Sequence, residues 1–209
     1  MARGLFITLE GGEGAGKSTQ AARLAARLRA AGRSAVSTRE PGGSTGAEAI
    51  RALLVNGEVD RWSATAETLL MYAARFDHVE RVIVPALARG DIVICDRFAD
   101  STRAYQGAGG GANLALIDAL EVETKALCWP DLTLIFDLTP DLGLKRASGR
   151  YGSETRFEAK GLAFHKRLRE AFLAIARADP DRCRILDAAA GEDDVEAAAW
   201  DAVSHYLGQ

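Results

Sequence analysis

A glycine-rich loop between a strand and a helix limits this chain to few possible folds. The run Leu5–Leu9 is apolar and rich in β-forming residues, and it leads directly into the motif G-x-x-x-x-G-K-S over residues 11–18. A helical pattern follows, with Leu24 and Leu28 on one face. A buried strand, a glycine loop and a helix in this order are typical of a phosphate-binding loop.

The residue types in this loop suit a nucleoside triphosphate. Glycines allow successive backbone N–H groups to converge on a phosphate, and the following helix adds the positive end of its dipole. Lys17 is placed to reach the β- and γ-phosphates, and the Ser18 hydroxyl to ligate Mg²⁺. A strand–helix turn that binds nothing is the alternative, and the full motif in its proper context argues against it. The predicted nucleotide-binding set is Gly11, Gly12, Glu13, Gly14, Ala15, Gly16, Lys17, Ser18 and Thr19.

Length and composition indicate a single α/β domain over residues 1–209. Hydrophobic residues make up 48% of the chain and charged residues 26%, as in ordinary globular proteins. The net charge of −3 provides no general attraction to nucleic acid or to an anionic membrane, so we expect neither as a partner. The three cysteines have no C-x-x-C spacing, and the start of the chain leaves no room for a signal peptide. These features predict a cytoplasmic protein with reduced cysteines.

Strands that alternate with helices predict a parallel sheet with helices on both faces, here the five-stranded sheet of a P-loop NTPase fold with a small lid at about residues 147–158. A long helical pattern starts at about Ala64 and reaches Ile83, and Pro85 is expected to kink or restart it. Residues 99–113 are polar and glycine-rich and carry no helical prediction. Further strands are expected at about 34–38, 92–95, 132–138 and 183–186.

The functional site is expected at one edge of this sheet. Ligands of such folds bind beyond the carboxyl ends of the strands. That rule brings together Glu10–Ser18, Arg39–Gly43 and Asp96–Tyr105.

The phosphate-binding loop alone does not indicate a reaction class, but two sequence motifs that are missing exclude one class. No aspartate has a glycine three positions later, and neither Asn56 nor Asn113 is followed by Lys-x-Asp, so the signatures of a GTPase switch are missing. A motor or helicase would need a larger chain or a nucleic-acid surface. Phosphoryl transfer to a small acceptor remains.

The positions of three arginines suggest that this acceptor already carries a phosphate. Arg39, Arg75 and Arg97 all fall on the expected acceptor side. Guanidinium groups match phosphate oxygens in a bidentate manner, which favours a phosphorylated acceptor over an alcohol. Each arginine alone also fits a solvated or ion-paired surface residue.

Several sequence blocks, in the same order along nearly the whole chain, resemble the bacterial thymidylate kinases. They are Glu10–Thr19, Thr38–Gly43, Leu70–Arg75, Asp96–Phe98, Ser101–Thr102, Ala104–Gly107, Pro130–Leu134 and Gly143–Arg146. The resemblance implies transfer of a phosphoryl group from ATP to dTMP with Mg²⁺, and a homodimer that pairs through helices. The apolar residues on more than one face of the 64–83 helix are compatible with such pairing.

The resemblance also implies roles for individual residues. Arg97 and Arg75 would hold the dTMP phosphate, and Glu13 would accept a hydrogen bond from the 3′-OH. Tyr105 would crowd the sugar 2′ position and so favour deoxyribose. The implied dTMP-binding set is Glu13, Arg39, Pro41, Met71, Arg75, Arg97, Ser101, Thr102, Tyr105 and Gln106, with Ser101 and Thr102 near the thymine edge.

The implied catalytic set is Lys17, Asp96, Arg97 and Arg150, with Ser18 and Asp96 at the metal and Arg146 over the adenine. Some family members carry an arginine in the phosphate-binding loop where this chain has Gly14, and others supply it from the lid. The lid here holds Arg150 and Arg156, and we prefer Arg150 because it lies beside glycines.

One departure from the family pattern concerns the acceptor base. The family commonly has a phenylalanine four residues before the arginine of the Arg75 block, and this chain has Met71. Methionine can cover a ring face, but looser base selectivity is expected. The alternatives are another nucleoside-monophosphate or deoxynucleoside kinase, or a nucleotide-binding regulatory protein without transfer activity, which would need neither the acceptor-side arginines nor Tyr105.

Overall fold

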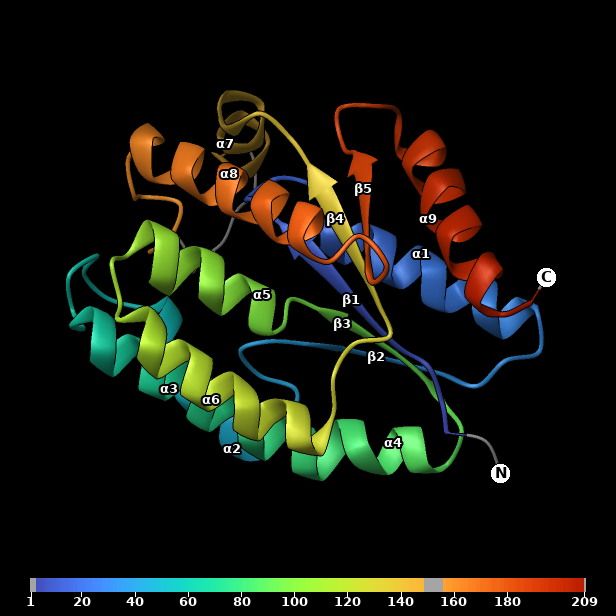
Figure 1. Ribbon diagram of the computed structural model, residues 1–209. Helices are drawn as coiled ribbons and strands as arrows, with labels where there is room; N and C mark the ends of the chain where they lie inside the picture. The colour runs from blue at the N-terminus through green and yellow to red at the C-terminus, as the bar shows by residue number, and fades with distance from the viewer. Residues whose placement is uncertain (1–2, 149–155, 209) are drawn as a thin grey trace.

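One parallel sheet organises the chain (Figure 1). The computed structural model describes residues 3–148 and 156–208. Within these residues five strands pair in the order β2-β3-β1-β4-β5, all parallel. This confirms the predicted five-stranded sheet. The strands are β1 (Phe6–Gly11), β2 (Ala35–Arg39), β3 (Ile92–Asp96), β4 (Leu132–Asp137) and β5 (Cys183–Asp187).

Helices cover both faces of this sheet. Figure 1 shows α1 and α9 together on one side, where they pack on Ile7, Leu9 and Leu134. On the other side α4 packs near Phe6 and α8 near Ile135. Adjacent strand residues point to opposite faces, so strands buried on both sides consist of continuous apolar runs. The helices are α1 (Lys17–Ala30), α2 (Thr45–Val55), α3 (Ala64–His78), α4 (Val84–Ala88), α5 (Ala99–Thr102), α6 (Leu114–Leu127), α7 (Pro140–Ser148), α8 (Leu162–Ala178) and α9 (Glu192–Tyr206), with π-helical turns η1 (Val79–Ile83) and η2 (Arg103–Gly109).

The strand register brings the carboxyl ends of the inner strands to one edge. Leu9 of β1 pairs with Asp96 of β3, and Asp96 in turn pairs with Arg39 of β2. Gly11 pairs with Phe136 of β4. The phosphate-binding loop, the Arg39 segment and the Asp96 segment therefore leave the sheet side by side, as expected from the sequence.

The long helical pattern after Ala64 is interrupted before Pro85, as predicted. α3 ends at His78, the π-helical turn η1 follows, and α4 begins at Val84. Proline has no N–H to donate to the carbonyl four residues earlier, so the helical hydrogen bonds change at this point.

Residues 99–109 are helical, which the sequence did not predict. They form α5 and η2, in which Asp100, Ser101, Thr102 and Gln106 are all buried. Their polar side chains make hydrogen bonds inside the protein instead of facing solvent. The polarity of this segment therefore indicates a buried network and not a loop.

The three cysteines are free and buried, as predicted. No helix in the described ranges is long and apolar enough to cross a membrane.

Candidate active site

The phosphate-binding loop has the open geometry that an anion site requires. Gly14 and Gly16 adopt left-handed conformations with φ of 69° and 84°. A Cβ at Gly14 would meet the carbonyl oxygen of Gly143 on α7, so this close approach requires glycine. No side chain caps the N-terminus of α1 at Lys17. The first N–H groups of α1 thus remain available to a phosphate group.

Lys17 lies inside the phosphate-binding loop and places its positive charge there. Its ammonium donates to the Gly12 carbonyl at 2.7 Å, and the residue is 6% exposed. Burial, with the nearby Arg97 charge, lowers the pKa of Lys17 to about 8. A bound phosphate would stabilise this ammonium further, because it would add negative charge to that of the nearby Asp96 and Glu13 carboxylates.

Arg97 is held in a strained backbone conformation at the end of β3. Its φ is 72°, the single positive value among the described non-glycine residues. The guanidinium donates to the Gly11 carbonyl at 2.7 Å and to Glu13 at 3.1 Å, and it lies 4.8 Å from the centre of the Tyr105 ring. Strain of this kind persists where the surroundings fix it, and such positions cluster at functional sites.

Glu13 is an ionised carboxylate that the loop turns toward Arg97. Burial alone would raise its pKa, but Arg97 and Lys17 lower the pKa of Glu13 to about 2. The Tyr105 hydroxyl donates to the same carboxylate at 2.6 Å. Burial raises the pKa of Tyr105 well above its usual value, so this hydroxyl stays a donor. Glu13, Arg97 and Tyr105 thus form one charged cluster beside the loop.

Ser18 and Asp96 fit a magnesium ion. Their side-chain oxygens lie 2.5 Å apart, at the start of α1 and the end of β3. Mg²⁺ prefers oxygen ligands and usually retains several waters, so one hydroxyl and one carboxylate match its chemistry. The described residues contain no group of three or more His, Cys, Asp or Glu side chains that could hold a metal.

A cavity of about 400 Å³ opens beside the loop. The structure brings every residue predicted on the acceptor side to its wall, together with Lys17, Ser18 and Asp96. The predicted acceptor residues in the wall are Glu13, Arg39, Pro41, Met71, Arg75, Arg97, Ser101, Thr102, Tyr105 and Gln106. Their contact with a ligand remains a prediction.

Arg75 lies in the buried part of this wall. It is 2% exposed, and its guanidinium donates to Glu40 at 2.8 Å and to Thr102 at 2.9 Å. The guanidinium also lies over the rings of Tyr72 and Phe98. One nitrogen, Nη1, is buried without a hydrogen-bond partner in the described part of the chain. A buried donor without a partner costs free energy, which a bound acceptor would recover. Arg39, in contrast, is half exposed and pairs with Glu48.

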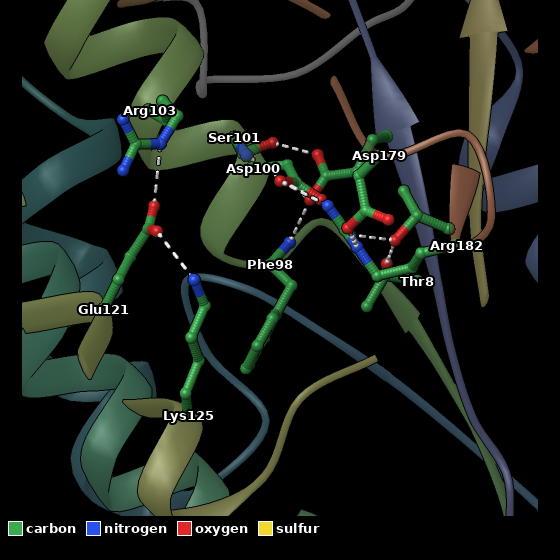
Figure 2. Close-up of polar contacts among 11 residues, drawn as sticks. Thr8, Phe98, Asp100, Ser101, Arg103, Glu121, Lys125, Asp179 and Arg182 are labelled. Atoms are coloured by element: carbon green, nitrogen blue, oxygen red, sulfur yellow. Dashed lines mark hydrogen bonds and ion pairs between the residues drawn. The ribbon is translucent and has the colours of Figure 1, made fainter. Parts of the chain in front are cut away.

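Glu10 holds the segment after Arg97 in place, a role that was not predicted for it. Its carboxyl accepts from the Phe98 N–H at 2.7 Å, the Ser101 N–H at 3.3 Å and the Ser101 hydroxyl at 2.5 Å. Its position, as a charged residue at the end of an apolar strand, is the sequence feature that could have indicated this role. Figure 2 shows the cluster next to it, in which Arg182 lies between Asp100 and Asp179.

The Glu10 carboxyl predicts a pH-dependent stability. Burial and the nearby Asp100 charge raise the pKa of Glu10 from 4.5 to about 8. Between these values the unfolded chain loses the proton that the folded protein keeps, so the free energy of unfolding falls as the pH rises. The expected slope is on the order of 1 kcal/mol per pH unit.

Urea unfolding of the wild type and of Glu10→Gln at pH 5, 6.5 and 8 measures this effect. The amide stays neutral, so the variant is expected to lose the difference between these pH values that Glu10 causes. Equal pH dependence in both proteins would contradict the assignment.

Arg146 and Arg156, one of the two arginines predicted for a lid, do not lie together in the described structure. Arg146 is on α7 and donates to the Ala188 carbonyl at 2.8 Å, away from the acceptor cavity. Arg156 is 3% exposed and donates to the carbonyls of Leu54, Glu58 and Val59. Arg150 lies outside the described residues.

Further residues in the cavity wall were not among the predicted site residues. They reach it from α2, from the turns that follow β2 and β3, and from the segment before α8. These residues are Glu40, Arg51, Val55, Phe98, Phe157 and Glu158.

Comparison with known proteins agrees with this geometry. A family described as thymidylate kinase matches residues 9–199. A thymidylate kinase of Caulobacter vibrioides is 63% identical over 208 residues, with both chains fully covered. One of Bradyrhizobium sp. (strain BTAi1) is 54% identical, over 98% of this chain and 92% of that protein.

A solved structure agrees as well. The crystal structure of thymidylate kinase from Ehrlichia chaffeensis superposes with a TM-score of 0.76 at 32% identity, over 96% of this chain and 99% of that one. The P-loop NTPase fold expected from the sequence is thereby confirmed. The chain belongs to the thymidylate kinase family.

Proposed function

We propose that this chain transfers the γ-phosphoryl group of ATP to the phosphate of dTMP, which yields ADP and dTDP. The observation that carries this proposal is the single cavity in which the acceptor-side residues meet Lys17 and Ser18 of the phosphate-binding loop. Donor and acceptor phosphates would thus meet between the loop and Arg97.

The donor would bind along the loop and the N-terminus of α1. The loop N–H groups and Lys17 would hold the β- and γ-phosphates, and Arg146 would lie near the adenine. Ser18 and Asp96 would hold Mg²⁺. When bound, this ion would neutralise negative charge on the phosphates.

The acceptor would bind with its phosphate at Arg97 and its sugar at Glu13. Arg97 lies in contact with the loop through Gly11. The Glu13 carboxylate is placed to accept from a 3′-OH, and Tyr105, bonded to it, would stand against a 2′ substituent. These contacts favour a deoxyribonucleotide.

We place Arg75 at the base end of the cavity instead of at the phosphate. Its contact with Thr102, a residue expected near the thymine edge, supports this position. The unpartnered Nη1 could then donate to a carbonyl of the base. Met71, also in the wall, would cover one face of the ring.

The chemistry requires no general base. A phosphate monoester with a second pKa near 6 is largely dianionic at neutral pH, so its oxygen can attack directly. The difficulty is the approach of two anions, so charge neutralisation and in-line positioning carry the rate. Lys17, Arg97 and Arg150 would supply positive charge, and Asp96 would act through the metal.

Several broader features belong to the same proposal. The chain would work as one nucleoside-monophosphate-kinase-like domain in the cytoplasm, with a lid at about 147–158. It would form a homodimer through its helices, since Leu69 on α3 and Leu114 and Val122 on α6 are exposed. Apolar side chains on neighbouring helices suit such an interface.

ADP formation with a panel of acceptors tests the proposed reaction. The panel is dTMP, dUMP, dCMP, dGMP, AMP, UMP and thymidine, each with ATP and Mg²⁺, and with the metal chelated as a control. We expect dTMP to be preferred, dUMP to react more slowly and UMP to be nearly inert. Equal use of several monophosphates, or use of thymidine, would contradict the assigned acceptor.

A further inference from the structure

Gln106 in the cavity wall is oriented by a carboxylate behind it. Its side-chain nitrogen Nε2 donates to Glu67 Oε1 at 2.8 Å, and both residues are buried. An ionised carboxylate has no proton to donate, so it can pair only with the NH₂ end of the amide. The amide oxygen of Gln106 must therefore point away from Glu67.

Arg156 fixes the Glu67 carboxylate from the other side. Its Nη2 lies 2.5 Å from Glu67 Oε2 in an ion pair that is almost completely buried. Arg156 also donates to the carbonyls of Leu54, Glu58 and Val59, so the α2–α3 connection holds its guanidinium in position. A paired and hydrogen-bonded charge is the form in which a buried carboxylate is tolerated.

The amide oxygen of Gln106 is free to meet a ligand. It has no hydrogen-bond partner among the residues that the structure describes, and Gln106 lines the acceptor cavity. We propose that Glu67 is a specificity-determining positioning residue, which turns the Gln106 oxygen toward the acceptor base and so selects a base with an N–H group there. This inference rests on the proposed dTMP kinase function.

Thymine and cytosine differ in the hydrogen bond that they can make at position 3 of the ring. Thymine has an N–H at position 3, whereas cytosine has a lone pair there. An acceptor oxygen opposite this position pairs with thymine and repels cytosine. Arg75, with its donors in the same wall, adds the complementary preference for a carbonyl at position 4.

The substitution Glu67→Gln should reverse the polarity of Gln106. Arg156 can only donate, so it would keep the oxygen of the new amide and leave its NH₂ facing Gln106. Gln106 would then turn its oxygen to that NH₂ and present its own NH₂ to the base. We expect the ratio of kcat/KM for dTMP over dCMP to fall about tenfold or more, with KM for ATP unchanged.

Gln106→Met is the matched control, because it keeps the length of the side chain and removes its polarity. In the Gln106→Met background, Glu67→Gln should have no further effect on the dTMP:dCMP ratio. Thermal melts confirm that each variant is folded. An unchanged ratio in folded Glu67→Gln, or the same loss in the Gln106→Met background, would overturn the proposal.

A second experiment uses the wild type, so that the inference can be tested even if Glu67→Gln does not fold. A dTMP methylated at N3 lacks the N–H, so the wild type should discriminate against it, and Gln106→Met should do so at least about tenfold less. Equal discrimination by both proteins would contradict the inference. Absence of dTMP kinase activity in the wild type would refute the proposed function, whereas a normal wild type with unresponsive variants would refute only the role of Glu67.

Discussion

Arg97→Met is expected to lower kcat/KM for dTMP by about 10²–10³-fold, because it removes the donor pair placed for the acceptor phosphate. In the structure the Arg97 guanidinium contacts Glu13, Ser101 and the Gly11 carbonyl. Methionine fills similar space but supplies neither charge nor donors. Steady-state kinetics with dTMP varied at saturating ATP measures the effect, and KM for ATP should change little.

Arg97→Gly separates this loss from damage to the fold. Glycine adopts a φ of 72° without strain, so its thermal stability should equal or exceed that of Arg97→Met. Both variants should be equally inactive if the guanidinium is what matters. An Arg97→Gly protein with near wild-type kcat/KM for dTMP would refute the assigned role.

Arg150→Ala should lower kcat by about 10³–10⁵-fold, the range typical of an arginine that stabilises transferring phosphoryl charge. Arg150 lies outside the described residues. Its glycine neighbours in the sequence and the buried position of Arg156 support its assignment. Arg156 is buried, pairs with Glu67 and holds the carbonyls of the α2–α3 connection. The contacts of its guanidinium are thus already made by Glu67 and by backbone carbonyls.

Arg156→Ala is the matched comparison. It leaves Glu67 as a buried charge without its partner, so we expect a loss of stability of about 3–5 kcal/mol and a higher KM for dTMP. Single-turnover rates at saturating substrates distinguish the two variants. Intact turnover in Arg150→Ala together with abolished turnover in folded Arg156→Ala would reverse the assignment.

The sequence was sufficient to predict the sheet and the edge that carries the site. The motif over 11–18 fixes a strand, a loop and a helix, and apolar runs such as Ile92–Cys95 mark strands buried on both faces. Since carboxyl ends of parallel strands meet at one edge, the loop and the segments after Arg39 and Asp96 were expected to lie together. The acceptor-side residues that the family resemblance implied, including Met71 and Arg75 on α3, line the same cavity.

The buried polar network was not predictable from pattern. Residues 99–109 contain polar side chains and glycines, which usually indicate a loop, yet they are helical because Glu10, Glu67 and Arg182 satisfy their polar groups from other elements. Those partners are distant in sequence, so no local spacing reveals them. The structural role of Arg156 was not predictable either, because its partners are also distant in sequence.

³¹P NMR of a single sample with ATP, Mg²⁺ and dTMP tests the transfer from ATP to dTMP, because it follows donor, acceptor and free phosphate together. We expect ADP and dTDP to appear in equal amounts, with no inorganic phosphate and no ATP consumption before dTMP is added. Release of inorganic phosphate without dTDP, or ATP consumption independent of dTMP, would contradict transfer to a nucleoside monophosphate and favour a nucleotide-hydrolysing regulatory protein.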